Sequence, residues 1–465
     1  MFARQPLLIL TVLLLAGGCA SYTTETAAMR QYWRAGDTTA AARAASGLAE
    51  KHGPDRDRIL LRLEQGAALR ADGQFAASSA VFENINATFS RDDFGPDLRI
   101  SSLGSGIVSN PAQIPYTGRA YDRIFAAAFN ALNYLALGDA PAARVALNNS
   151  YFWEQRAVQE NRKQIEAATA QLNAADQPGA EKALQQPEIQ GIYDTRLKHL
   201  EPYRVYAPYV NPFSVWLDGL FFLNLGADAS DLERARKSFE RLSDMVPKNK
   251  AVRQDFERAS KARGPSEKPL VYVVFETGSA PIRVAEIIDI PFFLFSDSVP
   301  YFGIALPTLS FNSSYRPYLT LRTAEGTFQT ELLADVDSII ATEFSDSYPV
   351  IFTRALISGL AKAALQYGIQ KSVSDQSEAV KSLVLLSGLF YQYSMNQADL
   401  RSWSTLPKQI QIASFPRPDD NLMFIEDTFG SPIRLQLEPS RHHLVYIQAP
   451  SRDAPLNIHQ FPLVR

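Results

Sequence analysis

One residue of this chain could carry covalent chemistry by its type and place. Cys19 is the single cysteine among 465 residues, so an intrachain disulfide is excluded. It follows an apolar run from Pro6 to Leu15, which Arg4 precedes and three small residues end. This order is typical of a secretory signal, and the run is too short to cross a bilayer as a helix. We therefore expect residues 1–18 to be a signal peptide that is cleaved just before the cysteine.

The residues around Cys19 resemble a bacterial lipobox, in which Ala16 stands at the position where leucine is usual. The resemblance implies that the thiol accepts a diacylglyceryl group and that acyl chains, palmitate among them, hold the mature protein at a membrane. Each buried methylene contributes about 0.8 kcal/mol to such an anchor. Ala20 and Ser21 follow, in place of the aspartate that retains such proteins at the inner membrane. The implied location is the outer membrane, facing the periplasm; the alternative is a buried structural cysteine.

The remaining reactive residue types form no catalytic motif. No two of the five histidines have the four-residue spacing of a helical zinc site: His52, His199, His442, His443 and His459. The side chains of adjacent His442 and His443 would point to opposite faces of a strand, and we expect them at a solvated edge. The patterns Gly-x-Ser-x-Gly and Ser-x-x-Lys are also missing. The sequence thus predicts no metal site, no cofactor and no enzyme activity.

Two segments carry residues that could bind a ligand. In the first, Arg401 and Trp403 alternate with Asp399, and a guanidinium can stack on an indole while it forks to a carboxylate. The alternative is a structural Asp399–Arg401 ion pair with Trp403 in the core. In the second, Tyr116 and Tyr121 flank a loop rich in turn residues and could line a groove. The alternative is that both tyrosines cover the end of the helix that follows.

Charge and composition exclude some classes of partner. With 46 basic and 49 acidic residues the formal net charge is -3, which gives no electrostatic footprint for nucleic acid. A hydrophobic fraction of 46% and a charged fraction of 20% are those of a globular protein with sizeable cores. The most apolar later segment, residues 382–398, is short for a membrane span and contains amide side chains, so we expect a buried helix there.

The elements that must position these residues differ between the two halves. Up to about residue 262, apolar residues recur at spacings of three and four, as on one face of a helix. A shared turn, in which a helix ends at a glycine and another begins after a few polar residues, recurs at residues 34–45, 70–82, 135–147 and 223–239. Glycine can adopt the left-handed conformation that ends a helix. Each turn therefore predicts a helical hairpin.

These hairpins resemble tetratricopeptide repeats. The residues that carry the resemblance are Gly66, Gly73, Phe82, Gly138, Gly219, Gly226, Ala235, Phe239 and Pro247. In such repeats the small residues let two helices approach closely, and the aromatic ring fills the groove between neighbouring hairpins. The glycines are unevenly spaced, so the array is degenerate, and the alternative is an irregular helical bundle. Only stacked repeats predict a concave binding surface.

The second half is rich in strand-like runs of β-branched and aromatic residues. They cover residues 270–278, 286–290, 303–311, 318–322, 327–332, 409–413, 422–426, 433–437 and 444–448. Helices are expected around 350–367 and 377–394. The fold class is therefore α+β: an all-α array of hairpins, then an α+β domain with an antiparallel, sandwich-like sheet and a helical pair. The predicted divisions are 1–18 signal peptide, 19–262 repeat domain and 263–465 C-terminal domain.

Taken together, "PYTGRAYDRIF", "NPFSVWLDGLF", "LVYVVFETGSAP" and "LRSWSTLPKQIQIA" resemble a family of bacterial outer-membrane lipoproteins with tetratricopeptide-type repeats, most of it uncharacterised. The resemblance implies no catalytic residues. Some relatives are encoded near activators of peptidoglycan synthases, which implies a role in the cell envelope.

We therefore expect an acyl-anchored scaffold that binds an envelope protein. One alternative is a glycan- or peptidoglycan-binding module in which Tyr116, Tyr121, Trp153 and Trp403 stack on sugar rings. Another is a hydrolase whose carboxylates or histidines come from distant segments.

Overall fold

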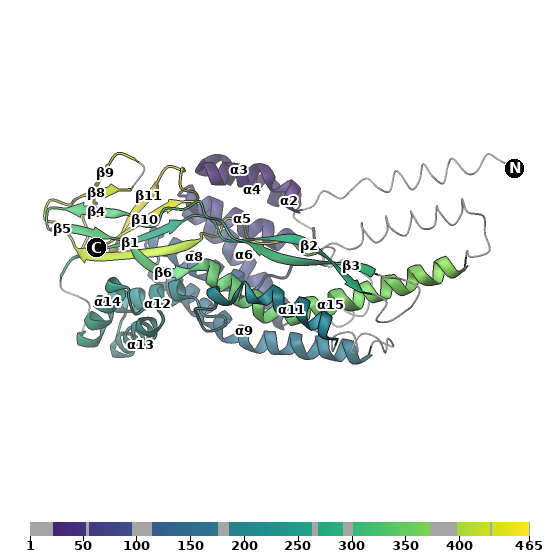
Figure 1. Cartoon of the computed structure of the whole chain (residues 1–465). Coiled ribbons are helices and arrows are strands. Elements are labelled where there is room, and N and C mark those ends of the chain that lie inside the picture. Colours follow the sequence, from purple (N-terminus) through teal and green to yellow (C-terminus); the bar gives the residue numbers. More distant parts are fainter. Residues whose placement is uncertain are drawn as a thin grey trace.

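Helices make up the first half of the chain in the computed structural model (Figure 1). The structure describes residues 22–52, 55–94, 114–174, 186–262, 268–291, 301–372, 398–427 and 430–464. The helices are α2 (Tyr22–Glu25), α3 (Ala27–Ala35), α4 (Thr38–Lys51), α5 (Arg58–Ala71), α6 (Phe75–Phe94), α8 (Ala120–Leu137), α9 (Ala140–Ala174), α11 (Pro187–Lys198), the 3-10 helix η2 (Glu201–Tyr203), α12 (Pro212–Leu225), α13 (Ala229–Met245) and α14 (Lys250–Lys261). Cys19, the signal peptide and the helix expected over 377–394 lie outside the described residues.

The predicted turns between paired helices are found where the glycines stand. Gly36, Gly73 and Gly138 follow α3, α5 and α8 with φ of 76°, 74° and 74°, so a left-handed residue follows each helix, as expected. Gly226 after α12 differs, because its φ is -64° and its conformation is extended. A Cβ atom at Gly226 would lie 2.3 Å from the carbonyl oxygen of Phe222. Close packing, rather than a left-handed backbone, therefore requires glycine at this fourth turn.

Two hairpins are closed by a phenylalanine ring that packs against a glycine. Phe82 of α6 lies against Gly66 of α5, where an added Cβ atom would be 2.7 Å from the ring. Phe239 of α13 lies against Gly219 of α12 in the same way, at 2.9 Å. Each ring therefore packs against the glycine of its own hairpin, and Phe82 also faces α8 and α9 of the next hairpin. Ala235 is fully buried on the same helix as Phe239.

The strands of the second half form two sheets and a hairpin. They are β1 (Leu270–Thr277), β2 (Ile282–Pro291), β3 (Tyr301–Ser310), β4 (Thr320–Thr323), β5 (Gly326–Gln329), β6 (Glu331–Asp335), β7 (Gln409–Pro416), β8 (Leu422–Glu426), β9 (Ile433–Gln436), β10 (His442–Ala449) and β11 (Asn457–Val464). One sheet has the order β11-β10-β1-β7-β6, the other has the order β5-β4-β8-β9, and β2 pairs with β3. The long helix α15 (Val336–Ser372) runs between β6 and β7 in the chain. The α+β fold class, a helical array followed by antiparallel sheets, is confirmed.

Strand β1 is the centre of the larger sheet and is buried along its whole length. Val271, Val273 and Phe275 face the smaller sheet, while Tyr272 and Val274 face the helices. Successive side chains of a strand point to opposite faces, so covering both faces explains the continuous apolar run of β1. One pairing differs from the antiparallel expectation, because β1 and β10 are parallel. A parallel pair needs a long crossover, which the residues between these two strands supply.

Other differences follow from local sequence. Strand β11 was not predicted, because His459, Gln460 and Pro462 interrupt its apolar pattern. Helix α15 begins well before the predicted residue 350 and includes Pro349, a residue that disfavours a helix interior. The expected solvated edge at His442 and His443 is wrong, because β10 lies between β11 and β1 and both side chains are fully buried.

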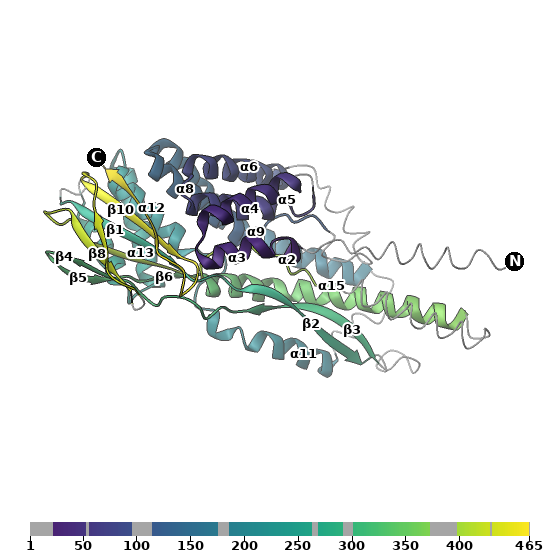
Figure 2. The same ribbon diagram turned by 90° about the horizontal axis from the view of Figure 1, so that it is seen from above.

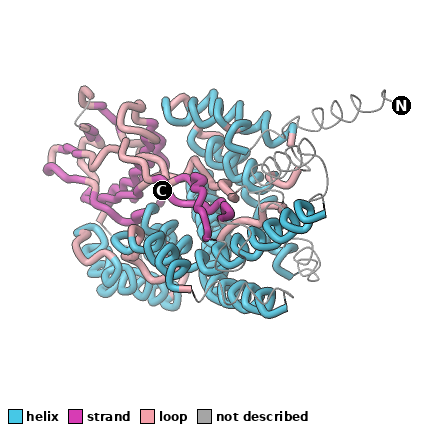
Figure 3. Tube along the Cα trace, turned by 45° about the vertical axis from the view of Figure 1, so that its right-hand side comes forward, coloured by secondary structure: helices cyan, strands magenta, loops and turns pink. Residues whose placement is uncertain are grey.

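The helices and sheets pack around a continuous core. Phe129 and Trp216 from the helical half belong to the same buried cluster as Tyr272, Trp403 and Leu444 from the second half. Figures 1 and 2 show the two sheets at one end of the described part, with α15 and the β2–β3 ribbon extending toward the other end. Figure 3 shows the strands gathered beside the helices. The boundary at residue 262 stays a prediction, but apolar packing continues across it.

Gly66→Ala is expected to lower the free energy of unfolding by about 1–3 kcal/mol, since the new methyl group would overlap the Phe82 ring. Chemical denaturation followed by circular dichroism measures the change. Gly191→Ala on α11 is the matched control, because among the described residues nothing beyond its own stretch of helix lies within 4 Å of the added Cβ atom. That variant should be unchanged or more stable by up to about 1 kcal/mol. Equal losses in the two variants would contradict the close-packing role of Gly66.

Candidate functional site

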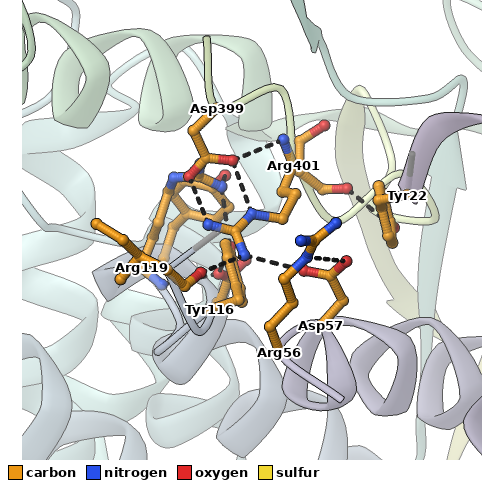
Figure 4. Close-up of polar contacts among 11 residues, drawn as sticks. Tyr22, Arg56, Asp57, Tyr116, Arg119, Asp399 and Arg401 are labelled. Carbon is orange, nitrogen blue, oxygen red and sulfur yellow. Dashed lines mark hydrogen bonds and ion pairs between the residues drawn. The ribbon is translucent and has the colours of Figure 1, made fainter. Parts of the chain in front are cut away.

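Charged side chains meet where the helical array contacts the segment 398–406 and α15 (Figure 4). We call this the charged junction, and it comprises Asp57, Tyr116, Arg119, Asp122, Arg283, Glu343, Asp399 and Arg401. It contains two of the four predicted binding residues, Tyr116 and Arg401, and a third, Tyr121, borders it and accepts a hydrogen bond from Arg119. The fourth, Trp403, lies in the core beside it.

Arg401 uses its guanidinium group inside the protein. Its Nε and Nη2 donate to the two carboxylate oxygens of Asp399 at 2.8 and 3.1 Å. Its Nη1 donates to Asp57 at 2.9 Å and to the carbonyl oxygen of Ile114 at 2.7 Å. Burial alone would raise the pKa of Asp399, but the adjacent Arg401 lowers it below its usual range. The structural Asp399–Arg401 ion pair is therefore present, and the hydrogen bond from Arg401 to Asp57 ties the segment 398–406 to the start of α5.

Tyr116 completes this arrangement from the loop before α8. Its hydroxyl donates to Asp122 and accepts a hydrogen bond from Arg119 Nη1 at 2.9 Å. The guanidinium carbon of Arg401 lies 5.4 Å from the centre of its ring, within the range of a cation–π contact. Burial raises the pKa of Tyr116 well above its usual value, and Asp122 raises it further. The hydroxyl stays protonated and acts as a donor to the carboxylate.

Glu343 of α15 caps the first turn of α8. Its two carboxylate oxygens accept the backbone N–H groups of Ala120 and Tyr121 at 3.0 and 2.9 Å. Negative charge at a helix N-terminus is favourable, and these amides have no partner within the helix. Burial nevertheless raises the pKa of Glu343 to about 7, and the charge of Asp122 adds to this effect. A carboxyl group with this pKa changes its charge near neutral pH.

The aromatic residues proposed as sugar platforms are enclosed. Tyr116, Tyr121, Trp153 and Trp403 are 5%, 3%, 2% and 1% exposed. Trp403 Nε1 donates to Thr405 at 2.8 Å, and its ring packs against those of Phe82 and Phe129. Stacking on a saccharide needs an open ring face, which none of these four side chains offers in this structure.

Two buried acids that join separate elements of the fold are absent from the residues predicted from the sequence. Glu64 of α5 accepts the backbone N–H groups of Ser404 and Thr405 at 2.7 and 3.1 Å. Glu276 of β1 pairs with Arg70 of α5 at 2.9 Å. The available signal was the presence of charged residues inside apolar stretches, because such residues are seldom buried without a partner. Sequence spacing gives no indication of which partner each one finds.

A second feature is a groove between α6, α8 and α9, with a cavity of about 280 Å³. Its lining combines small apolar side chains with three amides, Asn86, Asn130 and Asn149. Asn86 Oδ1 accepts a hydrogen bond from Trp153 Nε1 at 2.9 Å. Within the part of the chain that the structure describes, Asn130 Oδ1 has no hydrogen-bond partner although the residue is only 7% exposed. The groove therefore keeps hydrogen-bonding capacity that the fold does not use.

The described residues contain no group of three or more His, Cys, Asp or Glu side chains that could hold a metal ion. In the same ranges, no helix is both long and apolar enough to cross a membrane. The charged junction contains carboxylates, but each of those at its centre is bonded to an arginine or to a backbone amide.

No protein-family model matches the chain, and the comparison with curated proteins gave no match. Among solved structures, the chain is similar to a tetratricopeptide repeat protein from Parabacteroides merdae ATCC 43184. The identity is 11% over 52% of this chain and 99% of that chain, with a TM-score of 0.14. The likeness assigns no family.

The raised pKa of Glu343 predicts a pH dependence of stability. The folded state keeps the proton up to about pH 7, whereas the usual pKa is 4.5, so the folded state binds more protons between these values. The free energy of unfolding should therefore fall as pH rises from about 4.5 to 7, by as much as about 3 kcal/mol, and then level off. Glu343→Gln should remove this part of the slope.

Urea denaturation at pH 5 and at pH 7.5 measures the effect in each variant. Glu257→Gln on α14 is the control, because Glu257 is 69% exposed and forms only a surface ion pair with Lys261. Its slope should equal that of the unmodified chain. A Glu343→Gln variant that retains the full slope would show that this carboxyl group does not titrate near neutral pH.

Proposed function

We propose that this chain is a membrane-anchored, non-enzymatic scaffold of the bacterial cell envelope that binds a protein partner through its helical hairpins. Acyl chains on Cys19 would hold it at the outer membrane on the periplasmic side. The observation that carries the proposal is the array of hairpins fixed on a sheet, with an open groove between α6, α8 and α9. Helical-hairpin arrays present extended surfaces of this kind to partners.

The use of the buried charges supports binding over catalysis. Asp399 and Asp57 both accept hydrogen bonds from Arg401, and Glu343 caps α8. A general acid or base must reach a substrate, whereas these carboxylates are directed at other parts of the chain. Their role in the structure is to fix the position of the helices.

The position of the first described helix supports an anchor close to the folded body. Tyr22 of α2 is buried, and its hydroxyl donates to Glu64 of α5 at 2.7 Å. Cys19 precedes Tyr22 by three residues, and a chain of that length spans about 10 Å when extended. Acyl chains on Cys19 would therefore hold the end of the array near α2 against the membrane.

Cys19→Ala is expected to abolish labelling by radioactive palmitate and to release the protein from the outer-membrane fraction, because the acyl acceptor is lost. Crosslinking in living cells followed by mass spectrometry should enrich one envelope protein with the acylated chain and lose it with the variant. Ser21→Ala is the matched control, since it changes a neighbouring residue and keeps the thiol.

Unchanged labelling and fractionation of Cys19→Ala would contradict the anchor. If the acylated chain enriched no specific protein but sedimented with purified sacculi, the glycan-binding alternative would replace the scaffold.

A further inference from the structure

We infer that strand β2 pairs along its outer edge with the same strand of a second copy of this chain, so that two β2–β3 ribbons form one antiparallel sheet. The pairing needs neither acyl chains nor another protein, so it goes beyond the proposed scaffold function and can fail without it. It is carried by a free strand edge, by the exposed side chains on that edge and by the positions of its charges.

The β2–β3 ribbon has an edge that no other described strand covers (Figure 2). Its two strands are ten residues long and pair without a bulge, from Ile282 opposite Ser310 to Pro291 opposite Tyr301. Helix α15 packs against β3. The edge strand of a sheet presents a row of unpaired backbone groups, which is a template for pairing with another chain.

The prolines of the ribbon indicate which backbone groups point outward. In an antiparallel pair, residues that exchange hydrogen bonds alternate with residues whose backbone groups point away from the partner strand. Pro307 lies opposite Ala285, and Pro291 lies opposite Tyr301. A proline has no N–H to give to the ladder, so both belong to the second kind of pair. The backbone groups of residues 285, 287 and 289 therefore point to the outer edge of β2, where no hydrogen bond joins them to a described residue.

The side chains at these three positions are exposed as well. Ala285, Ile287 and Asp289 lie on one face of the ribbon, because alternate residues of a strand share a face. Ile287 is 62% exposed, which is unusual for an isoleucine in the middle of a strand. Pairing along this edge would remove apolar surface from water and satisfy the outward backbone groups in one step.

A two-fold axis through Ile287 gives a register in which these exposed residues pair with one another. Ile287 then lies opposite Ile287 of the second copy, and Ala285 lies opposite Asp289 of that copy. All of these residues have outward backbone groups, so successive hydrogen-bonded pairs can form. The axis places one apolar side chain against another and sets a small residue beside each carboxylate.

The opposite face of β2 favours the same register. Glu286 would lie opposite Ile288 of the second copy, and Arg196 of α11 already pairs with Glu286 at 2.5 Å. Moving the axis by one residue, to Glu286, would place two glutamates directly opposite each other. Like charges in that position destabilise a strand pair. The axis through Ile287 avoids this repulsion.

Charge complementarity favours a second copy as the occupant of the edge. Arg283 is 8% exposed and lies 5.0 Å from the ring centre of Phe344, and among the described residues it forms no ion pair. Asp289 is exposed and likewise forms none within the described part of the chain. In the proposed register, Asp289 of one copy is the diagonal neighbour of Arg283 of the other, within reach of a long side chain. The two-fold axis creates this contact twice.

The test is disulfide crosslinking of the full chain in membranes. Opposite residues of a hydrogen-bonded pair have Cα atoms about 5.5 Å apart, which suits a disulfide. Oxidation of Ile287→Cys with copper phenanthroline should give a band at twice the chain mass on a non-reducing gel. Val205→Cys is the matched control, because Val205 is also 62% exposed but follows η2, outside the ribbon. The unmodified chain, run in parallel, reports any contribution of Cys19.

A second measurement disrupts the pairing. Sedimentation equilibrium in a density-matched detergent should show a dimer of the unmodified chain. Ile287→Arg should raise the dimer dissociation constant at least tenfold, because two guanidinium groups would meet at the axis. Val205→Arg should leave this constant unchanged. Both variants should keep the melting temperature of the unmodified chain, since both side chains are exposed.

Several results would overturn the inference. These are a monomeric unmodified chain, no disulfide-linked dimer of Ile287→Cys, equal crosslinking of Val205→Cys, and equal association of Ile287→Arg and Val205→Arg. A crosslinked band of Ile287→Cys at a mass other than twice that of the chain would also overturn it, because a different protein would then occupy the edge of β2.

Discussion

The position in which the helical half docks on the larger sheet depends on one buried ion pair, Arg70 of α5 with Glu276 of β1. The same oxygen of Glu276 also accepts hydrogen bonds from Tyr446 at 2.7 Å and Gln448 at 3.1 Å, and Arg70 stacks on the ring of Phe129 at 3.9 Å. Burying both charges costs free energy that their attraction must offset, so such a pair adds little net stability. Its effect is to specify one docking position, because any shift of α5 along the sheet would leave two charges buried without partners.

In other contacts between the two halves, a polar side chain of one element satisfies backbone groups of another. Glu64 of α5 holds the segment around Ser404, and Glu343 of α15 holds the start of α8. Asn249 donates to the carbonyl oxygen of Leu332 in β6 at 2.9 Å. Backbone groups near the ends of helices and strands need such partners when they are buried. The helical array is thereby fixed on the sheet as one unit, and the groove between α6, α8 and α9 is held in shape.

These long-range partners explain where sequence reasoning succeeded and failed. Hairpin turns at Gly36 and Gly138 and the buried strand β1 follow from local conformational preference and periodicity, which a short window of sequence contains. The parallel pairing of β1 with β10 and the Arg70–Glu276 pair join residues that are far apart in the chain, so no local pattern specifies them. For the candidate site, the alternation of Asp399 and Arg401 indicated their ion pair, but the groove amides carried no distinguishing sequence signal.

The distribution of charge also constrains how a partner could be recognised. In the charged junction Arg401 binds Asp57 and Asp399, and Glu343 accepts backbone amides, so these groups leave little directional charge for a ligand. The groove offers neutral amides and hydrocarbon, whose hydrogen bonds are individually modest because water competes for them. Modest affinity is sufficient for a scaffold held at a membrane, since confining both partners to one surface raises their effective concentration. The proposed anchor on Cys19 would therefore offset a modest affinity by restricting where the scaffold and its partner can meet.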